Sequence, residues 1–151
     1  MIGSLFCSLG KALGACEIKT PPLTYWGDMD VYEVSSILIE KFQDAPLYLP
    51  DAYYKTCSKL DMERFLDWDM TNRERFETDS WDCDDFSWRL KGNITIKPWS
   101  SVPFFVVWTD LHALNGFISE DRKWHFVEPQ TDTIHDSLEA WQGSQIRFIG
   151  G

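Results

Sequence analysis

The sequence predicts an α+β fold in which helices come first and an antiparallel sheet follows. Apolar residues recur at helical spacing in the segments up to residue 91, and Gly92-Asn93 then gives a helix-stop signal. Beyond that point the apolar segments are short, and polar turns separate them. Runs of helices followed by runs of strands are typical of helices packed on one side of a sheet.

Length and composition indicate a single domain over residues 1–151. The chain has 44% hydrophobic and 15% aromatic residues, which is enough for a sizeable core. We divide it into an N-terminal arm and linker (1–22), a helical part (23–78), and a helix followed by the sheet (79–151). The net charge of -10 argues against nucleic acid or an anionic membrane surface as a partner. No feature of the sequence indicates an oligomeric state.

Caps and periodicity place the individual elements. Asp30 is expected to cap a helix over residues 31–42, and Ser58 a helix over residues 59–70. A third helix is expected over residues 81–91. The expected strands and extended segments cover residues 47–49, 94–97, 104–108, 112–118, 122–128 and 145–149.

The four cysteines are expected to be reduced and the protein cytoplasmic. Because they form no C-x-x-C pair and the three histidines no H-x-x-x-H pair, a structural zinc site is not expected. No segment reaches the roughly 18 apolar residues of a membrane span. Residues 2–15 are expected to form a weak helix, but Leu13-Gly14-Ala15-Cys16 resembles a lipoprotein cleavage box. An exported lipoprotein therefore stays an alternative.

Cys83 stands out because it lies near a predicted helix start. With Ser80 as the cap, Cys83 takes the third helical position, where backbone N–H groups are unpaired. Those groups and the helix dipole stabilise a thiolate, whereas Asp82, Asp84 and Asp85 oppose it. A reactive thiol would therefore need a cationic partner.

The predicted hairpin supplies a histidine and a carboxylate. If Ile118 and Arg122 close a three-residue turn, His112 lies opposite Glu128; a four-residue turn would place His112 opposite Pro129. In the first case both side chains share a face with the apolar residues Leu114, Ile118, Trp124 and Phe126. An imidazole facing a carboxylate can be oriented by it and charged beside it. A strand histidine and a strand-ending glutamate are the structural alternative.

Three sequence segments together resemble a known superfamily. If the face with the histidine packs on the helix bearing the thiol, the segments 82–86, 112–115 and 124–131 meet. In this order they resemble the papain-like and transglutaminase-like cysteine hydrolases. The Cys-His-Glu version is similar to the bacterial transglutaminase-like cysteine proteinases and to the protease domain of mushroom chimerolectins. A small phage-encoded member would fit this length and would lie in the host cytoplasm.

The resemblance implies roles for individual residues. Cys83 would be the nucleophile, His112 the general base and acid, and Glu128 the orienting group of a catalytic triad. The protein would then be a thiol protease or amidase that cleaves peptides or proteins through a thioester. Passing the acyl group to an amine would make it a transglutaminase-like acyl transferase. No oxyanion-hole glutamine precedes the thiol, so Trp81 would assist, and Asn115 would line the cleft.

Other interpretations stay open at this stage. The chemistry requires no cofactor, but calcium could bind the acidic residues Asp79, Asp82, Asp84 and Asp85. His125 and His135 receive no role. The non-enzymatic alternative is a papain-like binding or virion-associated module, since eight tryptophans on an acidic protein would suit contact with a protein or a carbohydrate.

Overall fold

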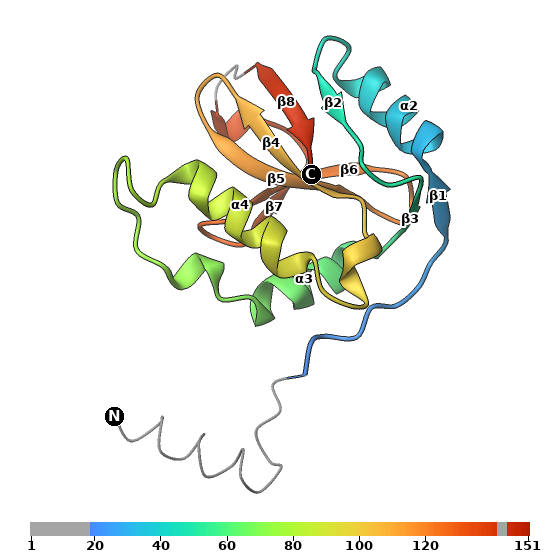
Figure 1. Cartoon of the computed structure of the whole chain (residues 1–151), viewed down its shortest axis with the longest axis horizontal. Coiled ribbons are helices and arrows are strands. Elements are labelled where there is room, and N and C mark those ends of the chain that lie inside the picture. The colour runs from blue at the N-terminus through green and yellow to red at the C-terminus, as the bar shows by residue number, and fades with distance from the viewer. Residues whose placement is uncertain (1–18, 142–144) are drawn as a thin grey trace, which may run out of the picture.

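A computed structural model describes residues 19–141 and 145–151 of the chain (Figure 1). The expected helix at residues 2–15, with Cys7 and Cys16, lies outside the described residues. The main feature is a six-stranded sheet with the strand order β2-β8-β4-β5-β6-β7, accompanied by a two-stranded sheet of β1 and β3. Within the described part of the chain, no helix has the length and apolar character needed to span a membrane.

The large sheet is almost entirely antiparallel. Its strands are β2 (Leu47–Tyr48), β8 (Ile146–Gly150), β4 (Phe104–Thr109), β5 (Ala113–Ile118), β6 (Trp124–Glu128) and β7 (Thr133–His135). Only β2, at one edge, runs parallel to its neighbour β8. The small sheet pairs β1 (Asp28–Asp30) with β3 (Tyr53–Lys55). The strands therefore draw on both halves of the chain.

The α-helices in the described residues are α2 (Val31–Lys41), α3 (Lys59–Trp68) and α4 (Cys83–Ile94). The Asp30 carboxylate caps α2, and the Ser58 hydroxyl caps α3, each by accepting a backbone N–H of the first turn. At α4 the Asp85 carboxylate accepts the N–H of residue 82 at 3.1 Å. Short 3-10 helices follow at Thr71–Arg73, Trp99–Ser101 and Glu139–Trp141.

The two faces of the sheet pack on different helices. One face buries Leu114, Ile118, Trp124 and Phe126 against α2, and we call it the α2 face. The other buries Phe104, Phe117 and Val127 against α3 and α4, and we call it the α4 face. Figure 1 shows α2 on one side of the sheet and the α3–α4 pair on the other. Side chains that alternate along β5 and β6 therefore reach different helices.

The predictions from caps and apolar runs are confirmed at most elements. The helices at 31–42 and 59–70 correspond to α2 and α3, and the buried run at 104–108 is β4. The strand expected at 94–97 is wrong, because α4 continues through Gly92-Asn93 and takes in Ile94. The sequence patterns missed β1, β3 and β7, which are each three residues long. The segment 23–78, which was expected to be mainly helical, therefore also contains the strands β1 and β3.

The predicted hairpin register is wrong. Ile118 lies opposite Trp124, so five residues connect β5 to β6, where three or four were expected. The connection closes through Ser119, whose backbone N–H donates to the Lys123 carbonyl at 2.9 Å. Arg122 adopts a left-handed conformation with φ of 63°, which lets the chain turn late. The real register differs from the expected one by an even number of residues, so each side chain keeps its face.

Candidate ligand-binding site

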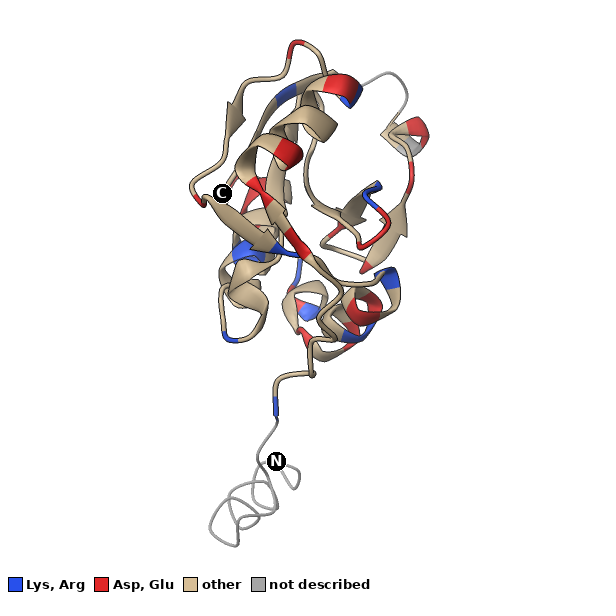
Figure 2. Cartoon of the chain, turned by 90° about the vertical axis from the view of Figure 1, so that its right-hand side faces the viewer, with Lys and Arg blue, Asp and Glu red and all other residues tan. Residues whose placement is uncertain are grey.

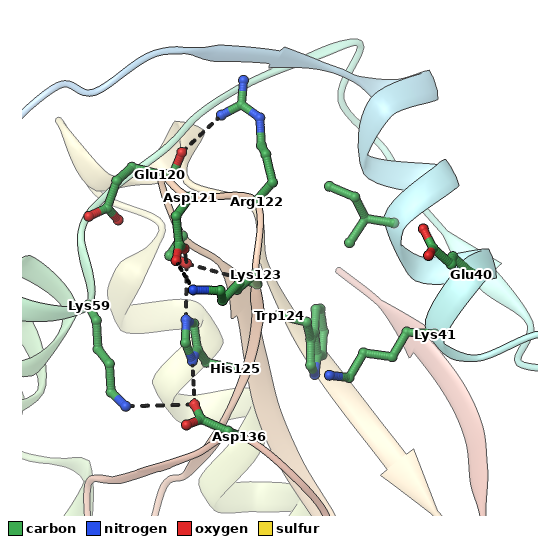
Figure 3. Close-up of a pocket in the computed structure, with 12 residues that line it drawn as sticks. Glu40, Lys41, Lys59, Glu120, Asp121, Arg122, Lys123, Trp124, His125 and Asp136 are labelled. Carbon is green, nitrogen blue, oxygen red and sulfur yellow. Dashed lines mark hydrogen bonds and ion pairs between the residues drawn. The ribbon is translucent and has the colours of Figure 1, made fainter.

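A pocket of about 800 Å³ lies between α2 and the β5–β6 hairpin (Figure 3). Ile37, Glu40 and Lys41 of α2 form one wall, and the hairpin from 119 to 125 forms the other. Lys59 and Asp136 complete the lining. This volume lies within the range of small-molecule sites.

A chain of hydrogen bonds holds one wall of the pocket in place. Ser119 Oγ lies 3.0 Å from His125 Nε2, and His125 Nδ1 lies 2.8 Å from Asp136 Oδ1. Lys59 extends the chain with an ion pair to Asp136 at 3.7 Å. The hydrogen bond from His125 and the charge of Lys59 lower the pKa of the Asp136 carboxyl. The connected groups fix the side chains that face the pocket.

The serine of this chain is not placed to act as a nucleophile, although the order Ser-His-Asp matches a catalytic triad. Ser119 is only 1% exposed, and its hydroxyl lies 2.5 Å from Asp121 Oδ1. The hydroxyl has a single hydrogen, and Asp121 and the Lys123 carbonyl at 3.1 Å both accept it within the turn, so the hydroxyl is engaged there. The arrangement is a structural brace of the hairpin turn.

Most cations around the pocket are already paired. Lys123 binds Asp121 at 2.6 Å, which lowers the pKa of that carboxyl to about 2. Arg122 binds Glu33 of α2 at 2.6 Å and donates to the Asp28 carbonyl at 3.2 Å. Acidic residues outnumber basic ones in the chain by 24 to 14, and Figure 2 shows them spread over helices and loops. Free positive charge is therefore scarce.

Two buried polar atoms of the pocket lining have no hydrogen-bond partner in the described part of the chain. They are Nε1 of Trp124 and Oε2 of Glu120. Trp124 is 3% exposed, and Gly116 makes room for it, because a Cβ there would lie 2.1 Å from the indole. Trp124 and Lys41 both line the pocket (Figure 3). A buried donor without an acceptor is costly, and a ligand can satisfy it.

The structure brings together His112 and Glu128, two of the residues that the sequence singled out. His112 Nε2 lies 2.7 Å from Glu128 Oε2, and the Gln130 N–H donates to the other carboxylate oxygen at 3.1 Å. The imidazole stacks on Trp141, with ring centroids 5.7 Å apart. Because the true register shifts by two residues, the pair meets diagonally and not directly across the hairpin.

Cys83 is half-buried at the first position of α4, two positions earlier than expected. Among the residues that the structure describes, no hydrogen bond joins its thiol to His112 or Glu128. The physical reason lies in the packing: α4 covers the α4 face, whereas Glu128 continues the alternation of Trp124 and Phe126 on the α2 face. The apolar residues of the face with the histidine thus pack on α2, and the joint role expected for Cys83, His112 and Glu128 stays a prediction.

The other two residues predicted for the cleft, Asn115 and Trp81, make packing and hydrogen-bond contacts away from the pocket. Asn115 is buried and donates to the carbonyls of Ser87 and Phe105 at 3.0 and 3.3 Å, which ties α4 to the sheet. Trp81 packs edge-on against Phe86, with ring centroids 5.8 Å apart, and its Nε1 has no partner in the described residues. Neither residue lines the pocket in Figure 3.

The calcium site expected at the acidic start of α4 stays a prediction. Ligand atoms of Asp82, Cys83 and Asp84 lie within 4.8 Å of one another. A shared hydrogen bond lowers the pKa of Asp82 and raises that of Asp84. Asp85 is engaged in capping the helix, and Asp79 sits in a left-handed turn with φ of 61°.

The sequence interpretation missed the residues of the pocket. It gave His125 no role and assigned none to Lys41, Ser119 or Asp136. Only the length of the hairpin connection carried a signal, because a five-residue turn places Ser119 beside His125.

The fold is similar to that of solved lectin structures. The structure described as the PSL1a–E64 complex has a TM-score of 0.72 and 20% sequence identity, and the match covers 82% of this chain and 50% of that chain. The structure of Polyporus squamosus lectin bound to the human-type influenza-binding epitope Neu5Acα2-6Galβ1-4GlcNAc has a TM-score of 0.66 and 19% identity, with coverages of 82% and 49%. The chain thus spans about half the length of these lectins. No protein-family model and no curated protein matches it.

These comparisons correct the family, the activity and the partner expected from the sequence. The similar structures are those of a lectin, so the predicted papain-like or transglutaminase-like α+β fold is wrong. The predictions of a cysteine hydrolase and of a peptide or protein substrate are wrong on the same grounds. The sequence motifs that suggested this fold and activity are short. They do not determine which face of the sheet α4 covers. A sheet of six strands, fed by both halves of the chain, dominates the molecule.

Proposed function

We propose that this chain is a carbohydrate-binding module that holds its ligand in the pocket between α2 and the β5–β6 hairpin. The indole N–H of Trp124, which is buried in the pocket wall and has no partner among the residues that the structure describes, carries this proposal. The likeness of the fold to a lectin bound to a glycan supports it.

The lining offers the groups that sugars require. A sugar hydroxyl both donates and accepts, so it can pair with a carboxylate on one side and an N–H on the other. Glu40 and Glu120 supply acceptors, and Lys41 and Trp124 supply donors. Ile37 supplies apolar surface for the C–H groups of a sugar ring. The braced wall at His125 means that little side-chain freedom is lost on binding.

Calorimetric titration of the full chain tests the proposal. The ligands are Neu5Acα2-6Galβ1-4GlcNAc, the neutral Galβ1-4GlcNAc, and E64, the compound of the PSL1a complex. We expect at least one glycan to bind, and Trp124→Phe to weaken it about 10-fold, because one hydrogen bond is worth roughly 1–1.5 kcal/mol. Trp88→Phe, at a half-exposed tryptophan of α4, is the matched control and should bind like the wild type.

Two outcomes would overturn the proposal. The first is that neither glycan binds at millimolar concentration, including the case in which E64 alone binds and labels Cys83. The second is that a glycan binds with the same affinity to Trp124→Phe as to the wild type. Thermal unfolding of both variants shows that each is folded before it is titrated.

A further inference from the structure

We propose that the exposed face of the small β1–β3 sheet binds an extended basic segment of a partner protein, in which arginines stand two positions apart. This surface, which we call the β1–β3 face, consists of Tyr25, Asp28, Asp30, Tyr53 and Lys55. None of these residues lines the pocket, so the proposal does not depend on the carbohydrate-binding function.

The strand register places the β1 and β3 members of this face on one side of the sheet. Asp28 and Asp30 flank the buried Met29 in β1, so both carboxylates project from the opposite, exposed side. Directly opposed residues share a face, and the residues of β3 opposite the two aspartates are Lys55 and Tyr53. Figure 1 shows the two strands at the outer edge of the molecule, beside α2. The face is therefore open to a partner.

Two tyrosine rings stand on this face with most of their surface in water. Tyr53 is 74% exposed and Tyr25 is 57% exposed. Tyr25 is held there by its hydroxyl, which donates to Asp28 Oδ2 at 2.9 Å, and by the Lys55 ammonium, 5.8 Å from the centre of its ring. The position of that ammonium shows that the ring accommodates a cation. Exposed aromatic side chains are enriched where proteins contact one another.

The two aspartates offer negative charge to a partner. Asp28 accepts the tyrosine hydroxyl, and Asp30 accepts the backbone N–H of Glu33 at 2.9 Å, but neither carboxylate forms an ion pair in the described part of the chain. The guanidinium of Arg122 pairs with Glu33 and contacts β1 through the backbone carbonyl of Asp28. A partner that brings positive charge is therefore complementary to this face.

Arginine fits the face better than lysine does. A guanidinium group is planar, so it can pair with a carboxylate through two N–H groups and can stack on a tyrosine ring. Asp28 and Asp30 lie two residues apart in a strand, which corresponds to about 6.6 Å. An extended peptide with arginines at positions i and i+2 projects both side chains to one side at the same spacing. The expected partner motif is therefore Arg-x-Arg.

Lys55 is the group that opposes such a partner. Its ammonium already lies over the ring of Tyr25, and it repels a second cation. Lys55→Gln should therefore tighten a basic peptide by about 2- to 5-fold. If the face served only to pack apolar groups, this substitution would bring no such gain.

Fluorescence anisotropy of the full chain with three blocked peptides, each carrying an uncharged dye, tests the proposal. The first peptide contains Arg-Gly-Arg, the second has the same composition with the two arginines adjacent, and the third has lysines in place of the arginines of the first. We expect the first to bind about 5-fold more tightly than either of the others. Because all three carry the same charge, general attraction to an acidic protein would not separate them.

Variants of the chain locate the contact. Asp30→Asn removes a charge and keeps a residue that can cap α2, and Tyr53→Ala removes one ring. Each should weaken the Arg-Gly-Arg peptide by about 2- to 5-fold. The matched controls are Asp44→Asn, at an exposed position after α2, and Tyr48→Ala, at a tyrosine of β2 that is 62% exposed; both should bind like the wild type.

Three results would overturn the proposal: no peptide binds at millimolar concentration, the spaced and adjacent arginines bind equally, or the control variants weaken binding as much as Asp30→Asn and Tyr53→Ala do. Thermal unfolding shows beforehand that each variant is folded. The glycan titrations probe the pocket and the peptide titrations probe the β1–β3 face, so either proposal can fail while the other holds.

Discussion

Asp132 in the β6–β7 turn is expected to destabilise the protein at neutral pH. Burial, and then the negative charges of Asp69 and Asp67, raise its pKa from 3.8 to about 6, against the opposing effects of Asn72 and Arg73. The Asn72 amide donates to one carboxylate oxygen, and the other oxygen has no partner among the described residues. Ionising this carboxyl in the folded protein therefore costs more than ionising it in the unfolded chain.

The sign and size of the effect follow from linkage. Because the folded pKa lies above the unfolded one, the folded state binds more protons between about pH 4 and pH 6, and stability falls as the pH rises through that window. The difference between 3.8 and about 6 corresponds to about 3 kcal/mol at most. Asp132 is only partly buried, so solvent screening reduces this to about 1–2 kcal/mol.

Asp132→Asn removes the charge with little change of shape. Asparagine tolerates the left-handed backbone at this position, where φ is 58°, and its amide oxygen can still accept from Asn72. We expect the variant to be about 1–2 kcal/mol more stable than the wild type at about pH 7, and nearly equal to it at about pH 4. At neutral pH its melting temperature should rise by roughly 2–8 °C.

Urea unfolding at both pH values, followed by tryptophan fluorescence, measures the difference. Asp44→Asn, at an exposed position after α2, controls for the general loss of one negative charge. The reasoning is refuted if Asp132→Asn gains nothing at neutral pH. It is also refuted if the gain is the same at both pH values, because the effect would then not come from ionisation.

Three further predictions concern the core and its burial. Gly116→Ala would place a Cβ 2.1 Å from the neighbouring indole and should lower the free energy of unfolding by about 1–3 kcal/mol. In the control Gly92→Ala the new Cβ meets nothing within 4 Å, so no loss is expected, and urea titration compares the two variants. Asn115→Ala removes a buried amide that bonds to carbonyls of both α4 and β4 and should cost about 1–3 kcal/mol in the same assay. An unchanged midpoint would show that the amide does not tie α4 to the sheet. Burial raises the pKa of Cys57, so peptide mapping should find it alkylated only after unfolding and Cys83 alkylated in the native protein; native labelling of Cys57 would contradict its burial.

The sequence could predict elements whose signals are local. Asp30 and Ser58 mark α2 and α3, because each cap lies next to the apolar repeat that it starts. At Gly92 the local signal failed, since packing of Ile94 in the core of the α4 face extends α4 beyond it. Tertiary packing overrode the intrinsic preference of the stop signal.

The candidate site shows the limits more clearly. The contact between His112 and Glu128 was predicted although the register was wrong, because a shift of two residues preserves the face of each strand. The relation of Cys83 to that pair depended on which face of the sheet α4 covers, and no local pattern encodes that choice. The pocket was beyond prediction for the same reason, since Lys41 and Trp124 come to line one cavity only when α2 packs on the hairpin.

The contacts of Arg122 have a consequence for how a ligand enters the pocket. Its guanidinium group reaches both Glu33 and the Asp28 carbonyl, so the tip of the hairpin is held to β1 and to α2, the helix that forms the opposite wall of the pocket. The backbone on the two sides of the pocket entrance is therefore held at a fixed separation before a ligand arrives. Exposed side chains such as that of Lys41 reorient within nanoseconds, so capture and release should be fast and free of a slow opening step.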